Sequence, residues 1–287
     1  MRESPVPPIG YDGPLSLLAL DEGAGTRDGD DLRSVLDAWA QLRTQRGATY
    51  GVVLDETRGA DLARAAAGAG LVLAMPLEAP ARDGLELAHG DAFAQHVESF
   101  HLDVAKVALR WHPDDPADHK KAQAQQLVRV AAWLHETGRP LLVDLHVPPS
   151  ADDLDAVAGD AERAADEVVP ELTERVITEI HDLGIEADLW ALAAGGDAAA
   201  LASLVVSEGR DHVGILVAER DRDPEVLRRW MSQAAAEPAY RGVYVGRRSW
   251  GDASSAPNDD ARGEDVAART GEALARSVAR FEDARGA

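Results

Sequence analysis

Short apolar runs alternate along the chain with longer amphipathic stretches. Eight of these runs are rich in Val, Leu and Ala, as expected of strands that are buried on both faces. They span Leu15–Asp21, Gly51–Asp55, Leu71–Pro76, Val104–Trp111, Leu141–Val147, Ala187–Ala193, Val213–Glu219 and Gly242–Arg247. Strands that are separated in this way by helical stretches are typical of a parallel sheet.

The stretches between the apolar runs predict helices. The clearest span Asp30–Arg46, Asp61–Ala69, Ala117–Thr137, Ala161–Leu183, Asp197–Gly209, Pro224–Ala236 and Asp265–Glu282. Gly138, Gly184 and Gly209 stand where helices should end, because glycine readily adopts the backbone conformation that closes a helix. Eight strands with intervening helices favour the α/β class, as a (β/α)8 TIM barrel, over an open sheet. No Gly-x-Gly-x-x-Gly follows the first strand, which argues against a dinucleotide-binding fold.

A single barrel domain is expected over residues 1–287, a length that such barrels routinely use. Within it, residues 1–13 are expected to form an N-terminal tail and residues 265–282 a C-terminal helix. Residues 251–263 are rich in Ser, Asp and Pro and predict a polar loop.

Composition narrows the possible partners. The formal net charge of −22 should repel nucleic acid and anionic membrane surfaces. It also repels a phosphorylated ligand at long range, so a phosphate site needs arginines close by. The absence of cysteine excludes disulfides and thiolate chemistry. No cofactor is expected. The N-terminus lacks a signal-peptide pattern and no apolar run reaches the roughly 18 residues of a membrane span, so the expected location is the cytoplasm.

Polar residues gather at the ends of the apolar runs. Active sites of TIM barrels lie at the carboxyl ends of the strands, so these residues are the candidate site. They are Asp21, Glu22, Asp55, Glu56, Glu78, Arg110, His112, Asp144, His146, Glu219, Arg220, Arg247 and Arg248. Arg110, His112, Arg220 and Arg247 are candidate substrate or phosphate contacts. For Arg247, a phosphate fork and an ion pair with one of the many acids both stay open.

The chain has only three lysines, and one of them interrupts an apolar strand. Lys120 and Lys121 fall on a predicted helix and are expected in solvent. The alternation of Val104–Trp111 places Lys106 and Arg110 on one face and the bulky residues on the other, so Lys106 should point into the barrel. A buried ammonium needs a partner, and Asp144 on the next strand is the expected one. A structural ion pair and a catalytic amine both fit this position.

Asp144 and His146 form an Asp-x-His pair on one face of the fifth strand. Together with His112 they match the nitrogen and oxygen ligands of a small metal site. His112 is followed by Pro113 and two aspartates, a setting in which its side chain equally well caps or orders the loop.

Several strand-end segments together resemble one family. They are Gly51-Val-Val-Leu-Asp-Glu, Met75-Pro-Leu-Glu78, Lys106-Val-Ala-Leu-Arg-Trp-His-Pro-Asp-Asp115, Gly138-Arg-Pro-Leu-Leu-Val-Asp-Leu-His-Val-Pro-Pro149, Asp188-Leu-Trp190 and Val245-Gly-Arg247. Over about residues 10–252 the chain is similar to the aldolase-like domain fused to bacterial 5-dehydro-2-deoxygluconokinases. More distantly it resembles the tagatose-bisphosphate and sulfofructose-phosphate class I aldolases.

The resemblance implies a retro-aldol reaction on a ketose phosphate, with a lysine that forms a Schiff base with the ketone. In the family pattern that lysine follows Asp-Ile-Trp, whereas here Ala191 follows Asp188-Leu-Trp190. A strand-five glutamate is shortened to Asp144, and Glu219 replaces the glycine before Arg220, where it would repel a phosphate. The phosphate arginine of strand eight is retained as Arg247.

Three hypotheses follow for the function. The chain is an inactive aldolase homologue that binds a small carbohydrate-like or phosphorylated ligand, or a lyase in which Lys106 supplies the Schiff base with Asp144 and Asp21 as the other catalytic residues. Alternatively it is a metal-dependent enzyme that uses His112, Asp144 and His146. The ligand's identity is not determined by the sequence, and a homo-oligomer stays open.

Overall fold

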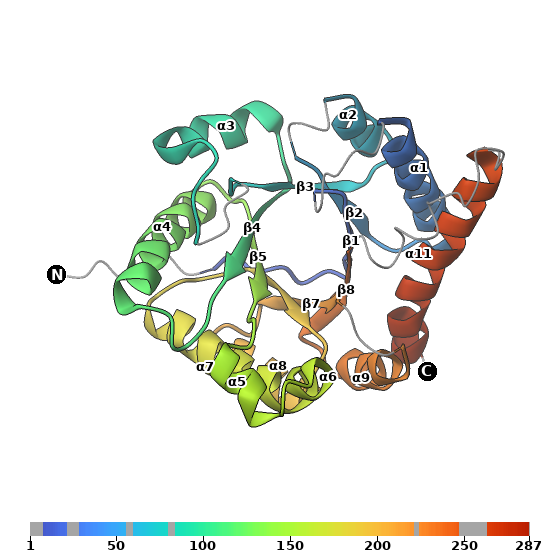
Figure 1. Cartoon of the computed structure of the whole chain (residues 1–287). Coiled ribbons are helices and arrows are strands. Elements are labelled where there is room, and N and C mark those ends of the chain that lie inside the picture. Colours follow the sequence, from blue (N-terminus) through green and yellow to red (C-terminus); the bar gives the residue numbers. More distant parts are fainter. Residues whose placement is uncertain are drawn as a thin grey trace. The chain divides into compact units, whose positions relative to one another are not determined.

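The computed structural model describes residues 8–21, 29–55, 60–79, 84–220, 224–246 and 263–286. Its strands are β1 (Ser16–Ala19), β2 (Tyr50–Val53), β3 (Val72–Pro76), β4 (Val104–Arg110), β5 (Leu141–His146), β6 (Leu189–Ala193), β7 (Gly214–Glu219) and β8 (Tyr240–Val245). They form a closed barrel in the order of the sequence (Figure 1). The pairs β8–β1, β1–β2, β2–β3, β4–β5 and β5–β6 are parallel. The predicted barrel is therefore confirmed, with each strand close to its predicted range.

The helices follow the predicted alternation, except that two short helices were not predicted and one predicted helix is divided. The structure shows α1 (Gly29–Arg46), α2 (Ala60–Gly68), the 3-10 turn η2 (Gly90–Ala92), α3 (Phe93–Phe100), α4 (Ala117–Glu136), α5 (Ala151–Ala156), α6 (Ala161–Arg163), the π turn η3 (Ala164–Val168), α7 (Val169–Asp182), α8 (Ala198–Val205), α9 (Pro224–Ala236) and α11 (Gly263–Gly286). The single helix expected over Ala161–Leu183 is divided, since Pro170 has no N–H to continue an α-helical ladder and a π turn absorbs the break. Short α3 and α5 were not predicted. No helix among the described residues has the length and apolarity to cross a membrane.

The chain packs as two compact units, and each contributes strands to the barrel. The first contains residues 1–12 and 77–215, the second residues 13–76 and 216–287. In the first unit β4 and β5 pair over their whole length, from Ala105 beside Leu141 to Arg110 beside His146. β5 continues the sheet to β6, where Asp144 lies beside Ala191. This register places the carboxyl ends of β4 and β5 level with each other.

A buried carboxylate organises the amino ends of these strands in the first unit. Asp188 is completely buried and accepts hydrogen bonds of 2.6 Å from the backbone N–H groups of Gly10 and Leu141. The imidazole Nε2 of buried His135 lies 2.9 Å from Oδ2, the oxygen that also accepts from Leu141. Backbone and side-chain contacts with His212 also hold residues 8–11. The described part of the predicted N-terminal tail is thus bonded to the core.

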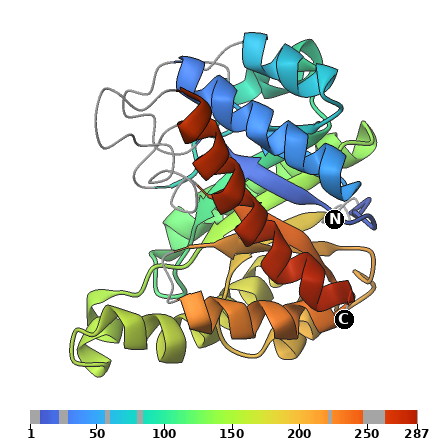
Figure 2. The same cartoon turned by 90° about the vertical axis from the view of Figure 1, so that its right-hand side faces the viewer.

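In the second unit, α11 runs between α1 and α9 (Figure 2). Near its end Glu282 accepts hydrogen bonds from Arg46 at 2.9 Å and from the hydroxyl of Tyr50 at 3.2 Å. Arg280 of the same helix donates to Glu219 at 3.3 Å. The predicted C-terminal helix therefore exists, slightly longer than expected. The predicted polar loop lies outside the described residues.

Gly10 tests how tightly the N-terminal segment is fitted. Its φ is +79°, and a Cβ added there would lie 2.4 Å from Cδ2 of His212. Gly47 has a similar φ of +69° but open space around it, so it is a matched control. We expect Gly47→Ala to cost about 1–2 kcal/mol of the free energy of unfolding, from backbone strain alone. Gly10→Ala should lower the free energy of unfolding by more than Gly47→Ala, as measured by urea unfolding. Equal losses would show that His212 moves aside without destabilising the protein.

A histidine in the first unit is held neutral. His181, at the end of α7, packs edge-on to Trp190 with ring centroids 6.2 Å apart. Burial lowers its pKa to about 4, and the positive charge of Arg210 acts in the same direction. Arg210 itself is fixed by a two-pronged ion pair with Glu186 at 2.8 and 2.9 Å.

This pKa predicts acid sensitivity. The folded value of about 4 lies below the ordinary value of 6.5, so between these values the unfolded chain binds a proton that the folded chain refuses. The His181 contribution to stability should be complete above pH 6.5 and decline as the pH falls toward 4. Between pH 7 and about pH 4.5, the free energy of urea unfolding should fall less in His181→Gln than in the unchanged protein. An equal loss in both would contradict this assignment.

Candidate functional site

The candidate site is built on the carboxyl ends of β4, β5 and β6 in the first unit. Arg110 ends β4 beside His146, which ends β5, and the backbone N–H of Trp111 continues the ladder with a 3.0 Å bond to the carbonyl of His146. Arg110 is exposed, whereas Trp111 is completely buried. Alternation along β4 therefore separates a polar face from an apolar face, as predicted.

Lys106 lies deeper on the polar face of β4 and is buried in an ion pair. Its Nζ is 2.8 Å from Oε1 of Glu78, and only 2% of the residue is exposed. The backbone N–H of Leu77 donates to the carbonyl of Lys106 at 2.9 Å, which places Glu78 within reach. The predicted burial of Lys106 against a carboxylate is confirmed, and the carboxylate in this ion pair is Glu78. A contact with Asp144 stays a prediction. Asp144 pairs in register with Ala108, two residues further along β4.

Asp144 and His146 form a second polar pair, on β5. The imidazole Nε2 of His146 lies 3.2 Å from Oδ2 of Asp144. Asp144 is 1% exposed, whereas 42% of the His146 side chain faces solvent. Ala191, which stands beside Asp144 on β6, is completely buried and has no amine. The pair therefore joins an interior carboxylate to an accessible imidazole at the strand end.

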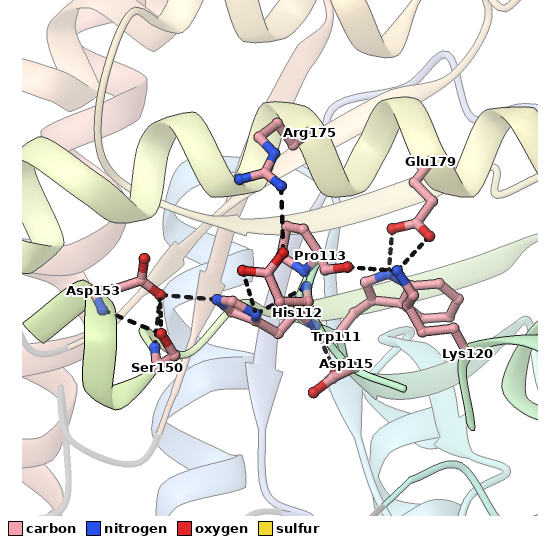
Figure 3. Close-up of polar contacts among 10 residues, drawn as sticks. Trp111, His112, Pro113, Asp115, Lys120, Ser150, Asp153, Arg175 and Glu179 are labelled. Atoms are coloured by element: carbon pink, nitrogen blue, oxygen red, sulfur yellow. Dashed lines mark hydrogen bonds and ion pairs between the residues drawn. The ribbon is translucent and has the colours of Figure 1, made fainter. Parts of the chain in front are cut away.

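The loop after β4 is held by His112, whose two ring nitrogens both have partners (Figure 3). The backbone N–H of Asp114 donates to Nδ1 at 3.2 Å, and Nε2 lies 2.9 Å from Oδ2 of Asp153. The neutral ring therefore carries its proton on Nε2 and donates it to Asp153. The backbone N–H of His112 donates to Asp115 at 2.8 Å. These contacts confirm the expectation that His112 orders its loop.

Asp153 belongs to a capping box that starts α5. Its Oδ2 accepts from the backbone N–H of Ser150 at 2.8 Å and from the hydroxyl of Ser150 at 2.6 Å. In return, the N–H of Asp153 donates to the Ser150 hydroxyl at 3.2 Å. The bonds from Ser150, and then the contact with His112, lower the pKa of Asp153. His112 thus connects the loop after β4 to the first turn of α5.

On the other side, α7 supports the same loop. Oε2 of Glu179 accepts from the indole N–H of Trp111 at 3.1 Å, and its Oε1 lies 2.7 Å from Nζ of Lys120 (Figure 3). Lys120 also donates to the carbonyl of Pro113 at 2.5 Å. Lys120 was expected in solvent, and this expectation was wrong because Glu179 holds it over the loop; Lys121 is exposed as expected.

The metal hypothesis is not supported by this arrangement. His112 is engaged by Asp153 and Asp114, and not by Asp144 or His146. Within the described ranges, no group of three or more His, Asp or Glu side chains is placed to hold a metal ion. The three predicted ligands are therefore not brought together.

The remaining predicted residues belong to the second unit. Asp21 follows β1 and Arg220 follows β7, and both are half-buried. Arg247 lies outside the described residues. Glu219, which was expected to repel a phosphate, is buried and bonded to Arg280 of α11 instead. Their roles in ligand binding stay predictions.

Sequence reasoning missed the roles of three residues in the first unit's site. Glu78 was recognised as a strand-end residue but not as the partner of Lys106, since no local pattern joins the two positions. Ser150 and Asp153 were detectable, because Ser-x-x-Asp before a helix is close to the capping-box signature.

Comparisons with known proteins agree with a barrel of the aldolase type. Residues 13–273 match the family described as "Uncharacterized protein conserved in bacteria (DUF2090)", and the chain belongs to this family. No curated protein sequence matches the chain.

Among solved structures, the chain is similar to a Schiff-base-forming fructose-1,6-bisphosphate aldolase, with 18% identity and a TM-score of 0.57. The similarity covers 93% of this chain and 94% of that one. Two structures of archaeal fructose-1,6-bisphosphate aldolase, one with the catalytic lysine bound to the carbinolamine intermediate, have 17% identity, the same TM-score of 0.57 and the same coverage. At these identities the similarity shows the fold alone, a closed barrel like that of these aldolases.

The Lys106–Glu78 pair makes a measurable prediction. Removing one buried partner leaves the other charge uncompensated, so Lys106→Met and Glu78→Gln should each destabilise the protein. Combined in a double-mutant cycle, they should show a coupling energy on the order of 1–3 kcal/mol in urea unfolding. Lys121→Met, an exposed lysine on α4, is the control and should add to Glu78→Gln without coupling. Additive losses for Lys106 and Glu78 would show that the pair contributes nothing of its own.

Proposed function

We propose that the protein is a divergent homologue of class I sugar-phosphate aldolases that binds a small phosphorylated or carbohydrate-like ligand at the carboxyl ends of β4, β5 and β6, without a Schiff base on β6. The observation that carries this proposal is the register of β5 and β6. It places Ala191 beside the buried carboxylate of Asp144, where the resemblance expects the lysine. A methyl group there supplies no electrophilic amine.

The side chains at these strand ends are suited to an anionic, hydroxyl-bearing ligand. Arg110 presents an exposed guanidinium, which binds phosphate or carboxylate oxygens through paired N–H groups. His146, beside it in register, adds an imidazole that both donates and accepts hydrogen bonds. The net charge of −22 disfavours an anion elsewhere on the protein, so local cations decide where it binds.

The alternative function is lyase activity through Lys106. The burial of the Lys106 amine favours this alternative. A lysine attacks a ketone only as the neutral amine, however, and the ion pair with Glu78 at 2.8 Å favours the ammonium form. A catalytic Lys106 would have to transfer its proton to Glu78 before it reacts. We therefore assign the pair a structural role.

Binding tests this function directly. In isothermal titration calorimetry with fructose 1,6-bisphosphate and with dihydroxyacetone phosphate as probes, we expect Arg110→Gln to weaken binding about tenfold, the value of one charge-assisted contact. Arg64→Gln, an exposed arginine on α2, is the matched control and should bind as the unchanged protein does. If neither probe binds, the proposal fails in its phosphate component.

Borohydride reduction in the presence of the same two ketones separates binding from Schiff-base chemistry. We expect the intact mass to stay unchanged after reduction. A reduced adduct that peptide mapping places on Lys106 would instead establish the lyase alternative, and Lys106→Met should then abolish the adduct.

A further inference from the structure

We propose that Asp144 and His146 form an acid–base pair that moves a proton at the carbon next to the carbonyl of a bound keto phosphate, so that the protein enolises its ligand without a covalent adduct. This inference rests on the proposed binding site at the ends of β4, β5 and β6. It adds an activity and a substrate class: small ketones or aldehydes that carry a phosphate and a hydrogen on the adjacent carbon.

The first observation is that one side chain of the pair is buried and the other is exposed. Asp144 is 1% exposed and cannot reach a ligand directly, whereas the His146 side chain is 42% exposed at the strand end. Their spacing of two residues on one strand places both on the same face. The 3.2 Å contact between Nε2 and Oδ2 lets the carboxylate accept the Nε2–H, which leaves the lone pair of the neutral ring on Nδ1. A carboxylate that fixes the tautomer of an imidazole in this way prepares it as a general base.

The rigid setting of His146 is the second observation. Its carbonyl accepts from Trp111 N–H at 3.0 Å, and Trp111 is buried and bonded to Glu179. The loop that follows His146 is fixed four residues later by the Ser150–Asp153 capping box, which His112 connects back to β4 (Figure 3). The strand end is thus held from both sides. A general base needs such support, because proton transfer depends on placement to within a fraction of an ångström.

Positive charge beside the base is the third observation. Arg110 is the register partner of His146 and is exposed at the same strand end. Alternation places it on the same face of β4 as Lys106. A guanidinium there can hold the phosphate of the ligand beside the imidazole and stabilise the negative charge that develops on the carbonyl oxygen.

The proton transfer balances without a further reactant. Nδ1 of the neutral imidazole takes the proton from the carbon, the electrons of the C–H bond form a C=C bond, and the carbonyl π electrons move to oxygen. The imidazolium then returns a proton to the carbon and the carbonyl re-forms. Because the imidazole faces solvent, its proton exchanges with water between the two steps, so each cycle in D2O replaces a hydrogen on the carbon by deuterium.

Proton NMR in D2O measures this exchange with dihydroxyacetone phosphate as the probe. The protein should be produced in a host that lacks triosephosphate isomerase, since that enzyme causes the same exchange. We expect exchange above the rate in buffer alone. His146→Gln should reduce the enzymatic rate at least about 100-fold, as removal of a general base does. Asp144→Asn should reduce it strongly too, because an amide that donates to Nε2 imposes the wrong tautomer.

The control is His89→Gln, an exposed histidine before η2, which should exchange the probe at the unchanged rate. Calorimetry on the same samples reports binding, and thermal melts report folding, so Asp144→Asn still tests the pair if His146→Gln does not fold. Binding without exchange overturns this inference and leaves the proposed function intact. Absence of both binding and exchange overturns both. Exchange that survives His146→Gln but disappears in Lys106→Met overturns the inference in favour of the lysine.

Discussion

The register between β4, β5 and β6 determines which side chains meet at the candidate site. Parallel pairing aligns Arg110 with His146 and Asp144 with Ala191, and a shift of one residue would turn each polar side chain toward the helices. Apolar residues in β4 and directly after it fix this register, because Val107, Leu109 and Trp111 are completely buried. Packing on one face of the strand thus decides the chemistry available on the other.

Buried charge in this protein is compensated locally. Lys106 has Glu78, Arg210 has Glu186 and Glu219 has Arg280, all at hydrogen-bond distance. The excess of acids in a chain with a net charge of −22 therefore says little about the electrostatics of the interior. An ion pair that is satisfied inside the fold contributes to its specificity, and the proposed function assigns the Lys106–Glu78 pair this structural role.

Much of the architecture could be predicted from the pattern of apolar runs, since every strand of the barrel lies where a run was found. Alternation also placed Lys106 correctly, because a strand inside the sheet allows its side chains only two directions. Alternation does not determine which carboxylate meets Lys106. Glu78 is brought there by the path of the chain after β3, which depends on three-dimensional packing. Helix α5 has only six residues, too few for helical periodicity to reveal it. Helix α3 was not predicted either, and Arg247 lies outside the described residues.

The π turn before α7 has a consequence for how insertions and deletions would act on this protein. An α-helix turns by about 100° per residue, so the extra residue held in Ala164–Val168 sets the rotational phase between α6 and α7. Leu172 and Val176 commit α7 to the core, so α7 keeps its orientation if one residue of the turn is lost. The segment before the turn, which leads back to α5 and Asp153, would then rotate instead. A deletion of one residue in this turn would therefore reorient α6 rather than α7, and residues 157–160 between α5 and α6 would have to accommodate the change.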